Sequence, residues 1–272
     1  MLIRSVTRGT WTQDSTNKLL ALAHANVPCT NSALSCYSFL EKPIVWGELR
    51  KIRDRIPHFP LIDQTLYPSY REMTVSPDLP CVGKTGSAHA GKGKIKIGTS
   101  ETFEDYASLV ALQPYFSTCE PFVHWDWDGR LQKIGPHVRV FSRRTETWKG
   151  NSGRGALIEE IELTPEYKQW ADECSKLFGG IDILGLDFVH DKATGKLVIL
   201  ELNDTAIGLV HRCELEDMGY MRDIVVAKMN QAARTKAAPE AEPKNLEVLA
   251  LQEQVRRLIV EKIKLAEQIA NK

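Results

Sequence analysis

A glycine-rich stretch with three lysines, residues 84–94, most constrains what this chain of 272 residues can fold into. The apolar residues before it (80–83) and the alternating residues after it (95–97) are typical of strands, so the stretch is expected to form the tip of a β-hairpin. Residues 86–92 match the pattern GxxxxGK. A P-loop would continue with Ser or Thr and then a helix, whereas Gly93 and a strand follow here. The stretch therefore indicates either a hairpin lid, whose backbone N–H groups and lysines close over phosphates, or a solvated basic hairpin.

The charge balance and the cysteines exclude several classes of protein. Lys and Arg together number 35, as do Asp and Glu, so no bulk charge attracts nucleic acid or an anionic membrane. The six cysteines are scattered without a CxxC pair, which is typical of reduced core residues. No apolar run reaches the length of a membrane span. We therefore expect a cytoplasmic protein without a transmembrane segment that binds no nucleic acid.

The order of predicted elements indicates a mixed α+β protein. A short strand at 1–3 precedes helices at 15–25, 35–40 and 43–54. Residues 59–123 are expected to form a small sheet, which begins with a strand at 59–62, and one helix at 104–112. Strands are then expected at 130–134, 138–141, 183–189 and 196–202. A helix capped by Thr164 and stopped at Gly179 separates the two strand pairs, and a last helix covers 218–233. The predicted divisions are 1–58, 59–230, a linker at 231–244 and a helical segment at 245–272.

The last segment carries a heptad seam. Its apolar members recur at spacings of three and four, with Lys262 as the one polar interruption: Val248, Leu251, Val255, Leu258, Leu265 and Ile269. A single helix of this length is marginal in water. We expect the segment to self-associate or to bind a protein partner, the alternative being a helix folded back on its own domain.

Three oxygen donors on two predicted strands indicate a metal site. Glu201 and Asn203 are two residues apart and therefore point to one face of a strand. Asp187 lies beside them if the two strands pair in antiparallel fashion through the turn near Gly195. Two carboxylates and an amide oxygen suit a hard divalent ion held against phosphates.

Two further stretches suit a nucleotide. The polar loop 143–155 is cationic and punctuated by glycine, which suits phosphate contact. The sequence Glu120-Pro121-Phe122 offers backbone groups and an apolar wall to an adenine ring.

Together these features resemble the ATP-grasp superfamily, and within it the central domain of the synapsins. The motifs that carry the resemblance are Phe59 to Thr65 with Tyr67-Pro68, the hairpin 84–94 with Ala88-His89-Ala90, Glu120-Pro121-Phe122, Arg130 to Gly135, Trp148-Lys149 and Phe178 to Asp182. The resemblance extends over residues 1–230. It implies an ATP-grasp fold with a truncated N-terminal subdomain and an added C-terminal coiled-coil-like helix.

The resemblance also implies roles for individual residues. The positions that match nucleotide contacts of the family are Lys42, Lys84, Lys94, Glu120, Phe122, Arg130, Arg143 and Asn151, with Arg144 as the alternative to Arg143. Asp187 and Glu201 match the ligands of the divalent ion, which would be Mg²⁺ or Ca²⁺. His124 stands where an acidic residue often meets the ribose.

The departures from the family leave the function open. Synapsins have Glu at the first metal position and lack the Asn, so Asp187 with Glu201 and Asn203 looks more like catalytic ATP-grasp ligases. One hypothesis is an ATP-binding protein that acts by binding and assembly, with peripheral vesicle or cytoskeletal association as one outcome. A second is an ATP-dependent carboxylate–amine ligase that forms an acylphosphate. A third is a structural assembly component that has lost ATP turnover.

Overall fold

The computed structural model describes residues 1–4, 14–86, 91–144, 148, 157–237, 253–254 and 257. The chain divides into two compact units, Met1–Met229 and Asn230–Lys272, and the first contains both sheets. The predictions for residues 87–90, for Asn151 and for the heptad seam lie outside the described residues. Among the helices that are described, none combines the length and apolarity that crossing a membrane requires.

Three helices open the first unit: α1 (Thr16–His24), α2 (Ala33–Ser38) and α3 (Lys42–Arg55). The Ser32 hydroxyl caps α2 by accepting a hydrogen bond from the backbone N–H of Ser35. Pro43 lies in the first turn of α3, where its missing N–H costs nothing. The start of α3 is therefore fixed at Lys42.

The smaller sheet has four antiparallel strands in the order β1-β4-β2-β3. They are β1 (Thr65–Tyr67), β2 (Cys81–Thr85), β3 (Lys94–Ile97) and β4 (Ser117–Pro121). Helix α4 (Ser100–Val110), capped by Thr99, packs on one face through Phe103 and Tyr106. The hairpin expected at the lysine-rich stretch is therefore present, as the pair β2–β3.

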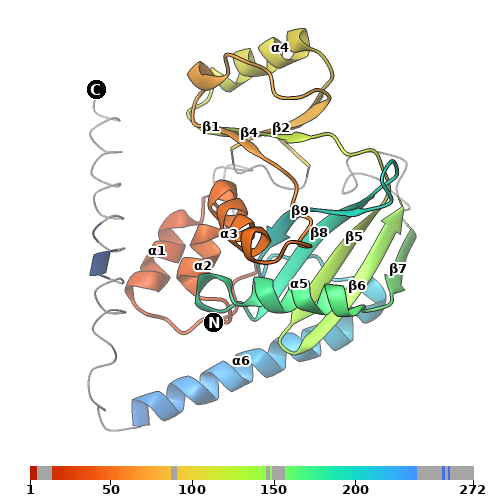
Figure 1. Cartoon of the computed structure of the whole chain (residues 1–272). Coiled ribbons are helices and arrows are strands. Elements are labelled where there is room, and N and C mark those ends of the chain that lie inside the picture. The colour runs from red at the N-terminus through yellow and green to blue at the C-terminus, as the bar shows by residue number, and fades with distance from the viewer. Residues whose placement is uncertain are drawn as a thin grey trace. The chain divides into compact units, whose positions relative to one another are not determined.

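The larger sheet has five antiparallel strands in the order β7-β6-β5-β8-β9. They are β5 (Trp125–Ile134), β6 (His137–Arg144), β7 (Leu157–Ile161), β8 (Ile183–Asp191) and β9 (Leu197–Asn203). Helix α5 (Pro165–Ser175) lies across this sheet, while β1, β2, β4 and α4 form a separate layer (Figure 1). The α+β class expected from the sequence is confirmed.

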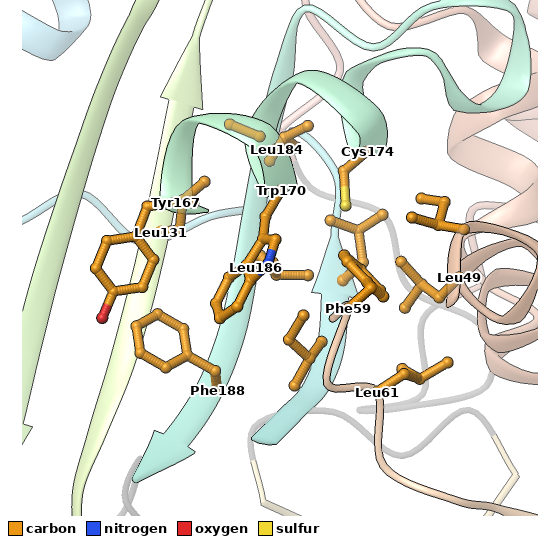
Figure 2. Close-up of a cluster of buried hydrophobic side chains, with 14 of the residues drawn as sticks. Leu49, Phe59, Leu61, Leu131, Tyr167, Trp170, Cys174, Leu184, Leu186 and Phe188 are labelled. Carbon is orange, nitrogen blue, oxygen red and sulfur yellow. The ribbon is translucent and has the colours of Figure 1, made fainter. Parts of the chain in front are cut away.

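The main hydrophobic core lies between the five-stranded sheet and helices α3 and α5. Trp170 of α5 is only 1% exposed and makes edge contacts with Phe59, Tyr167 and Phe188 (Figure 2). A Cβ at Gly129 would lie 2.2 Å from the Phe188 ring. Glycine is therefore required at this point of β5 for the aromatic cluster to close.

Several expected boundaries are wrong. Residues 1–3 form no strand, and Phe59 to Ile62 contribute only a single bridge, Leu61 to Ile199. The strand β7 falls in a stretch for which none was expected. The last helix, α6 (Glu214–Ala237), begins four residues early, and residues 231–237 of the predicted linker are helical.

Candidate functional site

A cavity of about 480 Å³ lies between the two sheets, within the first unit. Its volume is in the range of small-molecule sites in proteins. It brings together ten of the eleven site residues expected from the sequence: Lys42, Lys84, Lys94, Glu120, Phe122, Arg130, Arg143, Asp187, Glu201 and Asn203. The eleventh, Asn151, is outside the described residues.

The small sheet separates its apolar and polar side chains by strand alternation. Cys81, Ile97 and Cys119 face the core that packs on α4. Lys84 and Lys94 are directly opposite each other on β2 and β3 and face the cavity. The hairpin thus directs two ammonium groups into the cavity.

Lys84 already has a partner in the cavity. Its ammonium group forms an ion pair with Glu120 of β4, whose side chain is only 3% exposed. The other oxygen of Glu120 accepts a hydrogen bond from Gln64 Nε2 at 2.8 Å. The buried carboxylate is therefore satisfied on both oxygens.

The large sheet brings its acidic residues together through strand register. Asp187 of β8 is directly opposite Glu201 of β9 and also directly opposite Arg130 of β5. Arg130 Nε donates to Asp187 Oδ1 at 2.7 Å, and Asn203 Nδ2 donates to Asp187 Oδ2 at 2.9 Å. The antiparallel pairing on which the metal prediction depended is thus observed.

Glu201 is held between two lysines that come from different parts of the fold. Lys42 Nζ lies 2.6 Å from Glu201 Oε1 and 3.3 Å from Asn203 Oδ1, and Lys94 Nζ lies 3.7 Å from Glu201 Oε2. Burial acts to raise the pKa of Glu201, but the ammonium groups of Lys42, Lys94 and Lys84 outweigh it and hold this pKa well below its ordinary value. Glu201 is therefore ionised, and it links the start of α3 to the hairpin strand β3.

A fifth ion pair lies at the β5–β6 side of the cavity. Arg143 is directly opposite Asp128, and Arg143 Nε donates to Asp128 Oδ1 at 2.8 Å. Burial raises the pKa of Asp128, against the opposing effect of Arg143. Of the two arginines considered, Arg143 lines the cavity, whereas Arg144 is exposed at the end of β6.

Aromatic side chains gather near the end of β4. The ring of Phe122 makes edge contacts with His124 and Trp148, at centroid distances of 5.0 and 6.1 Å. Lys96 Nζ lies 3.7 Å from the Phe122 centroid. This part of the cavity can hold a flat apolar group.

The three predicted metal ligands fit a hard divalent ion by their chemistry, since Asp187, Glu201 and Asn203 all present oxygen donors within one cluster. In the part of the chain that is described, no group of three or more His, Cys, Asp and Glu side chains is arranged to hold a metal ion. The expected set includes only two carboxylates, and its third donor is an amide. Two of these donors face Lys42 and one faces Arg130.

Three charged residues in or next to the cavity were not predicted from the sequence: Asp128, Lys96 and Asp204. Asp128 alternates with Arg130 on β5, a pattern that could have indicated it. Lys96 alternates with Lys94 in the same way. Asp204 is 6% exposed and lines the cavity next to Asn203, and burial raises the pKa of this carboxyl group despite a hydrogen bond from Cys36.

Solved structures share this architecture. The chain is similar to the ATP-grasp ligase PsnB complexed with a minimal precursor, with a TM-score of 0.57 and 19% identity over 84% of this chain and 78% of that one. It is also similar to the D-alanine–D-alanine ligase of Bacillus anthracis, with a TM-score of 0.56 and 14% identity over 80% and 76% of the two chains. At these identities the likeness shows the fold alone, which is ATP-grasp.

Sequence comparison is more specific. The chain is 34% identical over 233 residues to the synapsin of Drosophila melanogaster, covering 83% of this chain. It spans 22% of that relative's length. Residues 31–231 match the family described as the synapsin ATP-binding domain. This chain therefore belongs to the synapsin family, as a member that carries its ATP-binding domain.

Proposed function

We propose that this protein binds ATP together with a divalent ion in the cavity between its two sheets, and that it acts through nucleotide-dependent binding and assembly. The observation that carries the proposal is the pairing of charges in the cavity. Each basic residue that lines the cavity, in the part of the chain that is described, is matched with a carboxylate: Lys42 and Lys94 with Glu201, Lys84 with Glu120, Arg130 with Asp187, and Arg143 with Asp128.

This pairing implies an exchange of partners on ligand binding. Phosphate oxygens would take over Lys42 and Lys94, which would leave Glu201 as an uncompensated, partly buried charge. A magnesium ion held by Asp187, Glu201 and Asn203 would supply the missing positive charge and neutralise the phosphates. Nucleotide and metal are therefore expected to bind tightly only together.

Magnesium and calcium both suit this donor set. PsnB, a structural neighbour with a TM-score of 0.52, is seen in complex with Mg and ADP, which supports magnesium here. The role proposed for each residue follows from its position in the cavity. Lys42, Lys84, Lys94, Arg130 and Arg143 would hold phosphates, and Glu120 and Phe122 would meet the adenine.

Isothermal titration of the full chain with ATP tests this proposal. We expect a micromolar dissociation constant with magnesium or calcium. In excess chelator we expect binding to be at least about tenfold weaker, a loss of roughly 1.4 kcal/mol. Lys51→Met, an exposed lysine on α3 paired with Glu48, is the matched control and should bind like wild type. If ATP produces no binding signal with either metal, the proposal is wrong, and the third hypothesis of a structural protein without ATP is favoured.

A ligase activity is the second candidate, because Asp187, Glu201 and Asn203 are brought together as a catalytic metal site would require. Release of ADP from Mg-ATP, measured with and without a mixture of free amino acids, separates the two candidates. The binding protein predicts no acceptor-dependent ADP release. Sustained release that needs an acceptor would favour the ligase.

For the segment 245–272 we propose self-association or partner binding through its heptad seam. Replacing Leu258 and Leu265 with Asp should abolish association, because each buried leucine contributes about 1.5–3 kcal/mol. Light scattering of the full chain provides the measurement, and ATP affinity should not change. A monomeric wild type that captures no partner would leave the segment as an intramolecular brace.

We also propose a cytoplasmic location, with contact to vesicles or the cytoskeleton only at the periphery. All six cysteines are free and buried, which suits a reducing compartment. Microscopy of the tagged full chain checks the location. A secreted or luminal signal would contradict it.

A further inference from the structure

Lys96 has a different environment from the other two lysines of the hairpin strands. Lys84 and Lys94 line the cavity and approach carboxylates. Lys96 does not line the cavity, and its ammonium group lies over the face of the Phe122 ring, 3.7 Å from the centroid. At this distance a lysine is attracted to the electron-rich face of an aromatic ring.

The geometry explains how a lysine of β3 reaches a residue beyond β4. Lys96 is directly opposite Val82 of β2, and Val82 is directly opposite Glu120 of β4. By strand alternation these three side chains point to the same face of the sheet, toward which Phe122 also points. Lys96 therefore reaches across β2 and ties the edge strand β3 to the segment after β4.

Phe122 itself is a wall of the cavity. Its ring is held by edge contacts with His124 and Trp148 and by the cation of Lys96. The ammonium group of Lys96 covers one face of the Phe122 ring, so the orientation of this ring depends on the position of strand β3. The packing of a nucleotide base against Phe122 would therefore depend on the position of β3.

We propose that Lys96 is a positioning residue for the nucleotide base: it orients Phe122 and so couples strand β3 to the base end of the site. The inference rests on the proposed binding of ATP in this cavity. It assigns Lys96 no contact with phosphate, in contrast to Lys84 and Lys94. Its effect should therefore depend on whether the ligand carries a base.

Titration with two ligands tests the inference. ATP and inorganic tripolyphosphate, each with magnesium, share the phosphate chain but only ATP has a base. Lys96→Met keeps the aliphatic stem and removes the charge, and it should weaken ATP binding by about three- to tenfold, the range expected of a cation–π contact, while leaving tripolyphosphate binding unchanged. Lys96→Arg should restore ATP affinity, because guanidinium also packs on aromatic rings.

Two matched variants complete the design. Lys94→Met should weaken both ligands, since Lys94 faces the cavity and Glu201. Lys176→Met, which removes an exposed lysine paired with Glu173 on the far helix α5, should change neither. Thermal melting of each variant verifies that it is folded.

The outcomes separate this inference from the proposal on which it rests. If Lys96→Met weakens both ligands equally, Lys96 is a phosphate ligand and the inference is wrong. If wild type binds ATP and Lys96→Met binds it equally well, the inference alone is overturned. If wild type binds neither ligand, the proposed function fails and the inference fails with it.

Discussion

The two sheets that enclose the cavity differ in how firmly they are held. Among the described residues, the five-stranded sheet and its helices share a core of eighteen buried side chains, whereas the four-stranded sheet and α4 share a core of eight. Local stability in proteins follows the amount of buried apolar contact. The larger sheet is therefore expected to be the stable half of the site and the smaller sheet the half that opens first.

The predicted metal ligands and the lysines of the hairpin are divided along the same line. The larger sheet carries Asp187, Glu201 and Asn203, whose relative positions are fixed by direct cross-strand register. The smaller sheet carries Lys84 and Lys94 on a hairpin whose outer strand, β3, is at an edge. In the proposed function, the larger sheet would hold the metal ion in one geometry, and the hairpin of the smaller sheet would close over the phosphates.

The largest expected effect tests whether the two cores are separate. Trp170→Ala should lower the free energy of unfolding by about 3–5 kcal/mol, because it removes the centre of the larger core and leaves a cavity. Phe103→Ala, the corresponding change in the smaller core, should mainly increase amide hydrogen exchange in β1–β4. Urea unfolding and hydrogen exchange of both variants give the measurement.

If Phe103→Ala accelerates hydrogen exchange in β5, β8 and β9 as much as in the smaller sheet, the two sheets do not differ in stability as expected. The two cores would then form one cooperative unit. Val75→Ala, which trims a side chain that is 74% exposed, is the control for a mutation without a core effect.

The next effect tests the role of Glu201, which meets Lys42 and Lys94. Glu201→Gln should weaken metal-dependent ATP binding by about 10- to 100-fold, which corresponds to roughly 1–3 kcal/mol for a lost charged ligand. Without a metal the same variant should bind ATP at least as well as wild type, because Lys42 and Lys94 lose the carboxylate that competes with phosphate. Isothermal titration with magnesium and with chelator measures both quantities.

Glu173→Gln is the matched control for this variant. Glu173 also meets two basic residues, Arg55 and Lys176, but on the far side of the core from the cavity. Its replacement should leave both affinities unchanged. Equal ATP affinity of wild type and Glu201→Gln, with and without metal, would contradict the metal assignment.

How far the sequence predicts this molecule can be judged from individual residues. The hairpin, the helix capped by Thr164 and the strands that carry Asp187 and Glu201 were predictable, because strong local patterns define them. The strand predicted at 59–62 is only an isolated bridge between Leu61 and Ile199. Pro60 has no N–H to donate, so the segment pairs with Ile199 only through Pro60 O and Ile62 N.

The ion pairs could not be predicted in the same way. Arg130 meets Asp187 only because β5 and β8, which are far apart in sequence, pair in one register. Asp128 meets Arg143 because the β5–β6 hairpin extends beyond the predicted strands 130–134 and 138–141. The alternation of Asp128 with Arg130 places both side chains on one face of the strand, but alternation alone does not identify the ion-pair partner. β7 was missed for a related reason, since the first four of its five residues are exposed and show no apolar alternation.

The smallest expected effect concerns alkaline pH and the smaller core. Burial, followed by the neighbouring thiols of Cys119 and Cys81, raises the pKa of Tyr67 to about 12. The pKa of an unfolded tyrosine is about 10, so the stability that Tyr67 contributes is fully present below about pH 10 and is lost as the pH rises toward about 12. Near pH 11 this loss amounts to about 1 kcal/mol.

Tyr67→Phe should remove that part of the alkaline sensitivity, because phenylalanine cannot ionise. Urea unfolding of wild type and variant at about pH 9 and about pH 11 gives the comparison, and the late phase of tyrosinate absorbance should shrink in the variant by the contribution of one tyrosine. Tyr70→Phe, which changes a tyrosine that is 45% exposed, is the matched control and should behave like wild type. If wild type and Tyr67→Phe lose the same stability between the two pH values, the ring of Tyr67 is in contact with water at high pH. The smaller core would then open before its tyrosine ionises, which would make the contrast between the two sheets sharper than their buried residues alone suggest.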